Sequence, residues 1–79
     1  MDKKILASLT FPNPSESHLS LVLAETSKDF VVWGYNKQDK GYYNGHYFPI
    51  PHYPSKEDAK KAAYRTYIQK ITEMVKRYA

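Results

Sequence analysis

The segment from Ser55 to Ala79 constrains the fold most, because it has the pattern of one long amphipathic helix. Ser55 is a natural N-cap, since its hydroxyl can accept hydrogen bonds from amides of the first turn. Glu57 and Asp58 follow it and favour the positive end of the helix dipole. At about 100° per residue the apolar side chains share one stripe, which we expect to pack on a sheet. Its members are Tyr64, Tyr67, Ile68, Ile71, Met74, Val75 and Tyr78.

The residues before this helix are predicted to form strands. Residues 29–36 give the strongest signal, because β-branched and aromatic side chains dominate them. Residues 18–25 alternate, with leucine at every second position from Leu19 to Leu23. Further strands are expected at residues 3–11 and 41–48, where Gly45 is typical of a bulge or of a close approach by another backbone.

Prolines separate these segments and complete the fold prediction. The run Pro12-Asn-Pro-Ser is expected to end the first strand, because proline removes a ladder donor. Three more prolines predict that residues 49–54 are an extended connector outside the sheet. We therefore predict an α+β fold in a single domain, residues 1–79, with the helix at about 55–78. An antiparallel sheet of three to four strands would be packed by this one long C-terminal helix.

The charge of the chain is concentrated on the predicted helix. From Lys56 onward seven basic residues stand against three acidic ones, whereas residues 1–55 carry five of each sign, so the net charge of +4 lies on the helix. There is no cysteine, which excludes disulfides and thiolate metal sites. The apolar run after the first lysines is too short for a signal peptide or a membrane span, so we expect a cytoplasmic protein without membrane contact.

The sequence contains no recognisable catalytic pattern. The three histidines do not have a familiar metal-ligand spacing. A nucleophile elbow, a phosphate-binding loop, a dinucleotide fingerprint and paired carboxylates are all missing from the sequence. We therefore expect a protein that is not an enzyme and that uses neither a cofactor nor a metal.

Aromatic side chains gather in the third and fourth predicted strands. Twelve of the 79 residues are aromatic, and eight of these are tyrosine. We expect the side of the third strand that carries Gly34 to face the helix, which leaves Trp33 and Tyr35 on the outer face. Such side chains anchor protein interfaces and stack on bases, but they also pair across strands and stabilise small sheets. The candidate partner-binding residues are Trp33, Tyr35, Tyr43 and Tyr47.

The cations of the helix are a second candidate site. Three of them share one flank with polar side chains between them, as in a ridge that contacts phosphates. The alternative is an ordinary solvated face, since Glu57 can pair with Lys61 and Glu73 with Arg77 four residues away. The candidate nucleic-acid-binding residues are Lys61, Arg65 and Lys76, together with Lys56 and Lys60 near the helix start.

Three stretches resemble known protein families. The stretch Pro54-Ser-Lys-Glu-Asp-Ala-Lys-Lys-Ala-Ala resembles the start of the last helix of a double-stranded-RNA-binding domain. That resemblance implies RNA phosphate contacts for Ser55, Lys56 and Lys60. Residues 30–68 resemble the three-strands-then-helix plan of AP2 and integrase-arm DNA-binding domains. Many small, mostly uncharacterised phage and mobile-element proteins are similar in Phe30-Val-Val-Trp and Gly41-Tyr-Tyr-Asn-Gly-His-Tyr-Phe.

Two functional hypotheses follow from these patterns. The first is a phage or mobile-element protein that binds an acidic protein partner and inhibits a host defence system, as anti-CRISPR proteins do. The second is an accessory domain that binds DNA or RNA through the basic helix and the aromatic sheet. A homodimer is compatible with either hypothesis.

Overall fold

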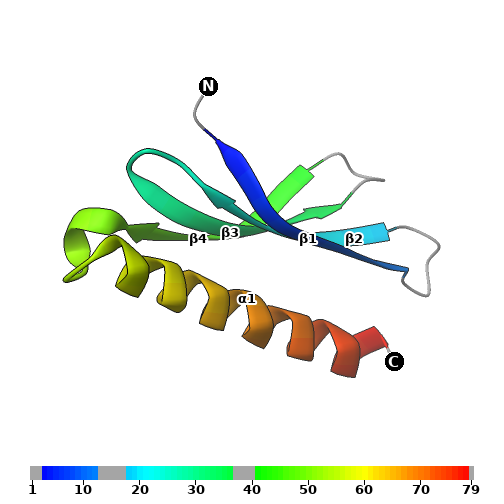
Figure 1. Ribbon diagram of the computed structural model, residues 1–79. Helices are drawn as coiled ribbons and strands as arrows, with labels where there is room; N and C mark the ends of the chain where they lie inside the picture. The colour runs from blue at the N-terminus through cyan, green and yellow to red at the C-terminus, as the bar shows by residue number, and fades with distance from the viewer. Residues whose placement is uncertain (1–2, 13–17, 37–40, 79) are drawn as a thin grey trace.

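The computed structural model describes residues 3–12, 18–36 and 41–78, with side chains described at 3–10, 20–34 and 45–76. In this part of the chain a four-stranded antiparallel sheet packs against one long helix (Figure 1). The elements are β1 (Lys4–Pro12), β2 (His18–Glu25), β3 (Asp29–Asn36), β4 (Gly41–Pro49), the 3-10 helix η1 (Ile50–His52) and α1 (Lys56–Tyr78). The predicted α+β fold is therefore confirmed.

The strands follow one another in space as they do in sequence, with β1 and β4 at the two edges of the sheet. Pro12 pairs with His18 and Pro49 pairs with Asp29, so both prolines belong to the sheet. The prediction that these prolines lie outside the sheet was wrong, because proline is tolerated at the end of an edge strand. The connector after Pro49 is also not extended throughout, since it contains η1.

A β-bulge divides β1 into two parts. Ile5 pairs with Ala24, whereas Ala7 pairs with Leu23, so Leu6 is an extra residue between the two pairs. Partners in an antiparallel pair point to the same face of the sheet. Ala7 therefore lies on the face of Leu23, and Ile5 lies on the opposite face with Ala24.

A second bulge lies in β4. The two residues of β3 that flank Trp33 pair with Tyr43 and His46, so Asn44 and Gly45 both lie opposite Trp33. A bulge was one of the two features expected at Gly45, and it is the one observed; Gly45 is exposed, so the helix does not cross over it.

The main core lies between α1 and the face of the sheet that the helix covers. Leu23, Phe30 and Val32 have no exposed surface there, and neither do Ala59 and Ala63 of the helix. Because alanine side chains are short, the N-terminal half of α1 can lie close to β2 and β3. The buried members of this core are Leu21, Leu23, Phe30, Val32, Ala59, Ala63 and Tyr67.

The predicted apolar stripe of the helix was partly wrong. Ile68 is 59% exposed and Val75 is 47% exposed, so neither belongs to the core. The helix contacts the sheet along the line of Ala59, Ala63 and Tyr67, and Ile68 lies about 100° around the helix from Tyr67. The apolar stripe is therefore wider than the contact, and one edge of it faces solvent.

The N-terminus of α1 has the capping interaction that the sequence predicts. The backbone N–H of Asp58 donates a hydrogen bond to the Ser55 hydroxyl oxygen at 3.2 Å. The Ser55 hydroxyl in turn donates to the Asp58 carboxylate at 3.0 Å. The first helical backbone bond runs from the N–H of Ala59 to the carbonyl of Ser55, at 3.2 Å. Ser55 is therefore the N-cap, and the helix begins at Lys56.

A buried hydrogen bond joins the middle of α1 to β2. The hydroxyl of Tyr67 donates to the backbone carbonyl of Leu21 at 3.3 Å. Burial raises the pKa of Tyr67, and the neighbouring Tyr64 raises it further. Tyr67 therefore stays protonated in the folded protein at a pH where it would ionise in the unfolded chain.

Replacing Ala63 with leucine should lower the free energy of unfolding by about 1–3 kcal/mol, because the larger side chain has to displace the surrounding core. Urea denaturation measures this loss. The matched control is Ala62→Leu at a half-buried position, where we expect a smaller loss. An Ala63→Leu protein as stable as the wild type would contradict the close approach of α1 to the sheet.

The raised pKa of Tyr67 predicts a loss of stability at alkaline pH. The unfolded chain releases this proton near the ordinary value of 10.0, whereas the folded protein keeps it. The contribution of the Tyr67 hydroxyl to the free energy of unfolding is therefore fully present below about pH 10. It is lost as the pH rises through the higher pKa of the folded protein. Tyr67→Phe should cost about 0.5–1.5 kcal/mol at neutral pH but should weaken the alkaline loss. Denaturation at about pH 8 and about pH 11 tests this, and Tyr47→Phe, at an exposed tyrosine, should behave like the wild type.

Candidate functional site

The sheet face that points away from α1 carries no other helix or strand in the described part of the chain (Figure 1). Phe30 and Val32 of β3 pack in the core beneath α1, whereas Val31 and Trp33 form a separate cluster. Because side chains alternate along a strand, Val31 and Trp33 lie on the uncovered side, which we call the open face. The prediction that Trp33 lies on the outer face is confirmed.

The strand register aligns one apolar row across all four strands of the open face. Its members are Ile5, Ala24, Val31 and Tyr47, in the order β1 to β4. Ala24 has no exposed surface and Val31 is 7% exposed. Ile5 and Tyr47, at the two ends, are 52% and 67% exposed. The row therefore has a buried apolar centre between two exposed apolar ends.

The neighbouring row is centred on Trp33. Trp33 pairs with Val22 of β2 and is only 9% exposed. It forms a small cluster with Ala24 and Val31, and the half-buried Val22 packs against this cluster. The sheet thus has a second, smaller apolar cluster on the side that no helix covers.

Two side chains border this cluster. The Lys3 ammonium lies 4.8 Å from the centre of the Trp33 ring, a cation–π contact. On β4, the ring of Tyr47 lies 3.5 Å from the position that a side-chain carbon on Gly45 would occupy. Since Gly45 has no side chain, the Tyr47 ring lies against it at ordinary contact distance.

The structure divides the predicted aromatic site. Trp33 and Tyr47 both lie on the open face, but Trp33 belongs to its buried centre and Tyr47 to its exposed margin. Tyr43 pairs with Gly34, and Tyr35 pairs with the neighbouring Tyr42. The side chains of Tyr35 and Tyr43 lie outside the described part of the structure.

Ile5 and Lys3 contribute to the open face although the sequence analysis did not select them. Counting alternate residues back from Ala7 assigns Ile5 to the helix side. The bulge at Leu6 reverses that assignment. A bulge in an edge strand leaves little trace in the sequence, so the alternation pattern could not identify these residues.

Three predicted cations lie on the side of α1 that faces away from the sheet. Lys61, Arg65 and Lys76 are all exposed. Among the described side chains no carboxylate pairs with any of them, and the expected pair between Glu57 and Lys61 is not formed. These cations are therefore available to a partner.

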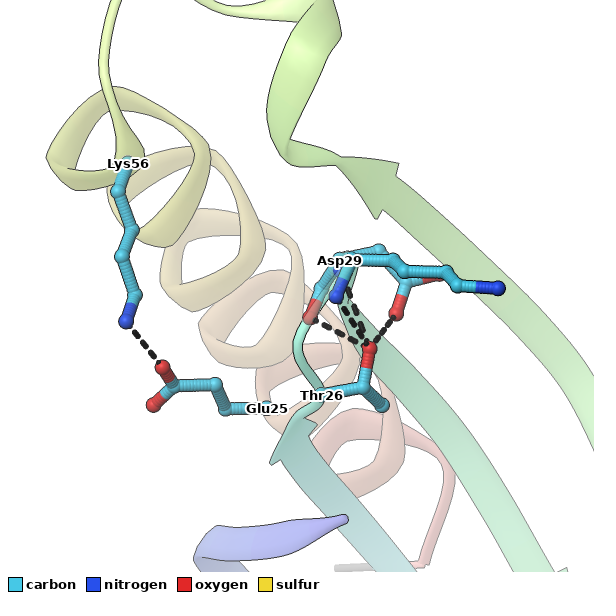
Figure 2. Close-up of polar contacts among 5 residues, drawn as sticks. Glu25, Thr26, Asp29 and Lys56 are labelled. Carbon is cyan, nitrogen blue, oxygen red and sulfur yellow. Dashed lines mark hydrogen bonds and ion pairs between the residues drawn. The ribbon is translucent and has the colours of Figure 1, made fainter. Parts of the chain in front are cut away.

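Lys56 and Lys60 have a different setting near the start of the helix, and Figure 2 shows that of Lys56. The Lys56 ammonium lies 2.6 Å from a carboxylate oxygen of Glu25. This hydrogen-bonded pair lowers the pKa of Glu25, and the charges of Lys4 and Lys60 lower it further. Lys56 thus pairs with Glu25 at the end of β2, and Lys60 acts on the same carboxylate through its charge.

The turn between β2 and β3 follows Glu25 directly and is closed by hydrogen bonds to Thr26 (Figure 2). The Thr26 hydroxyl donates to the Asp29 carboxylate at 2.7 Å. It accepts the backbone N–H groups of Lys28 and Asp29, both at 3.1 Å. The N–H of Ile50 donates to the carbonyl of Lys28 at 2.9 Å, which ties η1 to the turn.

Neither the described residues nor comparison with known proteins indicates a specific activity. No group of histidine, aspartate and glutamate side chains in the described ranges could hold a metal ion. No described helix has the length and apolar character needed to cross a membrane. No protein-family model, curated protein or solved structure matches the chain.

Trp33 and Tyr47 should differ sharply in their effect on stability. Trp33→Ala removes the centre of a buried cluster and should cost about 3–5 kcal/mol. Tyr47→Ala, at an exposed position, should change the free energy of unfolding by less than about 0.5 kcal/mol. Denaturation followed by circular dichroism measures both, and Trp33→Phe should recover much of the loss. Equal losses at the two positions would contradict this division of the open face.

Proposed function

We propose that this chain is a small non-enzymatic binding domain whose open face docks on a protein partner. The observation that carries the proposal is the exposure of Ile5 and Tyr47 at the two ends of a row with a buried centre. Protein interfaces combine a packed apolar centre with aromatic anchors such as tyrosine. An apolar surface of this kind gains stability when a partner covers its exposed ends.

The charge of the open face supports a protein partner over a nucleic acid. Its described exposed side chains are mainly apolar or carry hydroxyl groups, as at Ile5, Ser8, Thr10 and Tyr47. The hydroxyls of Thr10 and Ser20 bond to each other at 2.9 Å. Lys3 brings a cation to this face, and its ammonium lies over the Trp33 ring. Nucleic-acid binding depends on several cations at one surface, and the described side chains of this face do not offer them.

The resemblance to small phage and mobile-element proteins extends the proposal to a biological role. It rests on residues 30–33 and 41–48, which form half of β3 and most of β4. We propose that the chain covers a surface of a host defence protein and inhibits it, in the manner of anti-CRISPR proteins. Inhibition by covering a surface needs shape and apolar complementarity and no catalytic group.

A second candidate function is an accessory role in nucleic-acid binding. It is supported by Lys61, Arg65 and Lys76, which are exposed and have no carboxylate partner among the described side chains. Their contacts would be to phosphates, so binding would fall steeply as salt rises. This function would use the outward side of α1, whereas the first uses the open face.

Affinity capture from host-cell lysate tests the first function. The double variant Ile5→Ser/Tyr47→Ser should no longer capture a protein that the wild type captures. The affinity of this variant for the purified partner should be at least tenfold lower, or about 1.4 kcal/mol weaker. The matched control is Ile68→Gln/Val75→Gln, which removes exposed apolar side chains from α1 and should keep this partner. Circular dichroism confirms that both variants are folded.

Titration with short DNA and RNA at two salt concentrations tests the second function. Two results together would replace the first function with the second. One is salt-sensitive binding of DNA or RNA that requires Lys61 and Arg65. The other is that the Ile5→Ser/Tyr47→Ser variant captures the same protein as the wild type does.

A further inference from the structure

An exposed apolar strip runs along one flank of α1, apart from the core. Ile68 and Val75 are 59% and 47% exposed and lie seven residues apart, two turns along the helix. Thr72 lies between them and is exposed. Its hydroxyl donates to the carbonyl of Ile68 at 3.0 Å, which leaves the methyl group as the part available to a partner. Tyr64 and Ile71 are half-buried and connect this strip to the core.

Cations lie directly beside the strip. Arg65 precedes Ile68 by three residues and Lys61 precedes Arg65 by four, so these side chains are neighbours on the helix surface. Lys76 follows Thr72 by four residues on the same flank. The strip and these three cations together are called the helix flank.

Among the described side chains, no acidic residue of α1 forms an ion pair with the cations of the helix flank. A carboxylate oxygen of Glu73 lies 3.8 Å from the Lys70 ammonium. This pair is on a different side of the helix from Ile68 and Thr72. The side chain of Arg77, its expected partner, lies outside the described part. The helix flank thus combines exposed apolar groups with cations that have no carboxylate partner among the described side chains.

We propose that the helix flank is a second binding site and that it takes an acidic amphipathic segment of another protein. Apolar side chains spaced three and four residues apart on that segment would cover Ile68, Thr72 and Val75. Carboxylates beside them would pair with Lys61, Arg65 and Lys76. This site goes beyond the proposed function, because it lies on the helix and not on the open face.

Charge and shape favour this occupant over the others. A second copy of the chain would bring the cations of two helix flanks together, and like charges oppose such a contact. Phosphates of a nucleic acid would not cover the exposed surface of Ile68 and Val75. A membrane surface takes up the broad apolar face of a helix, and in α1 that face already packs on the sheet.

The test uses the whole chain and a synthetic helical peptide of about 20 residues, with leucine at the a and d positions and glutamate beside them. Fluorescence anisotropy of the labelled peptide should show saturable binding that weakens as salt rises. Ile68→Gln/Val75→Gln and Lys61→Gln/Arg65→Gln should each weaken it about tenfold or more. The matched control Ile5→Ser/Tyr47→Ser on the open face should bind as the wild type does.

Three results would overturn the inference. One is equal binding of a peptide with the same composition in scrambled order, since the site requires one apolar side. Another is peptide binding that is absent from the wild type or unaffected by the helix substitutions. The last is binding of a short oligonucleotide or of phosphatidylglycerol vesicles that is tighter than peptide binding and independent of Ile68 and Val75. None of these results bears on the open face, because the capture experiment has its own variant.

Discussion

The close contact of α1 with β2 and β3 is the interaction on which the rest of the domain depends. A chain of 79 residues without cysteine has to stabilise itself by burial around a small core. Phe30 and Val32 supply the large side chains of that core, and Ala59 and Ala63 let the helix lie against them. Since one helix covers only one face of a sheet, the opposite face has to stabilise itself through the cluster around Trp33.

This division gives the molecule two surfaces of different chemistry. The open face has apolar ends at Ile5 and Tyr47, whereas the helix flank adds cations to exposed apolar groups. The sheet and its main core lie between them. A partner bound at one surface therefore leaves the other accessible.

Most of the architecture could be predicted from the sequence, because alternation, proline breakers and the Ser55 cap are local signals. The open face could be predicted only in part. The alternation of Trp33 and Gly34 along β3 predicted which β3 side chains lie on the open face. The burial of Trp33 could not be predicted, because it depends on neighbours such as Lys3 that come from distant parts of the chain. The contact line of α1 was missed for a different reason: alanine is a strong helix former wherever it stands on a helix, so Ala59 and Ala63 did not stand out as core residues although both are fully buried.

The bulge at Leu6 makes the first residues of β1 an independently variable part of the surface. Leu6 packs against the main core, while Ile5 just before it is on the other face. The open-face side chains before the bulge, Lys3 and Ile5, can therefore change in size or charge without altering what lies beneath α1. In evolution this arrangement would let the domain acquire a new binding preference at its N-terminal segment while its packing is kept.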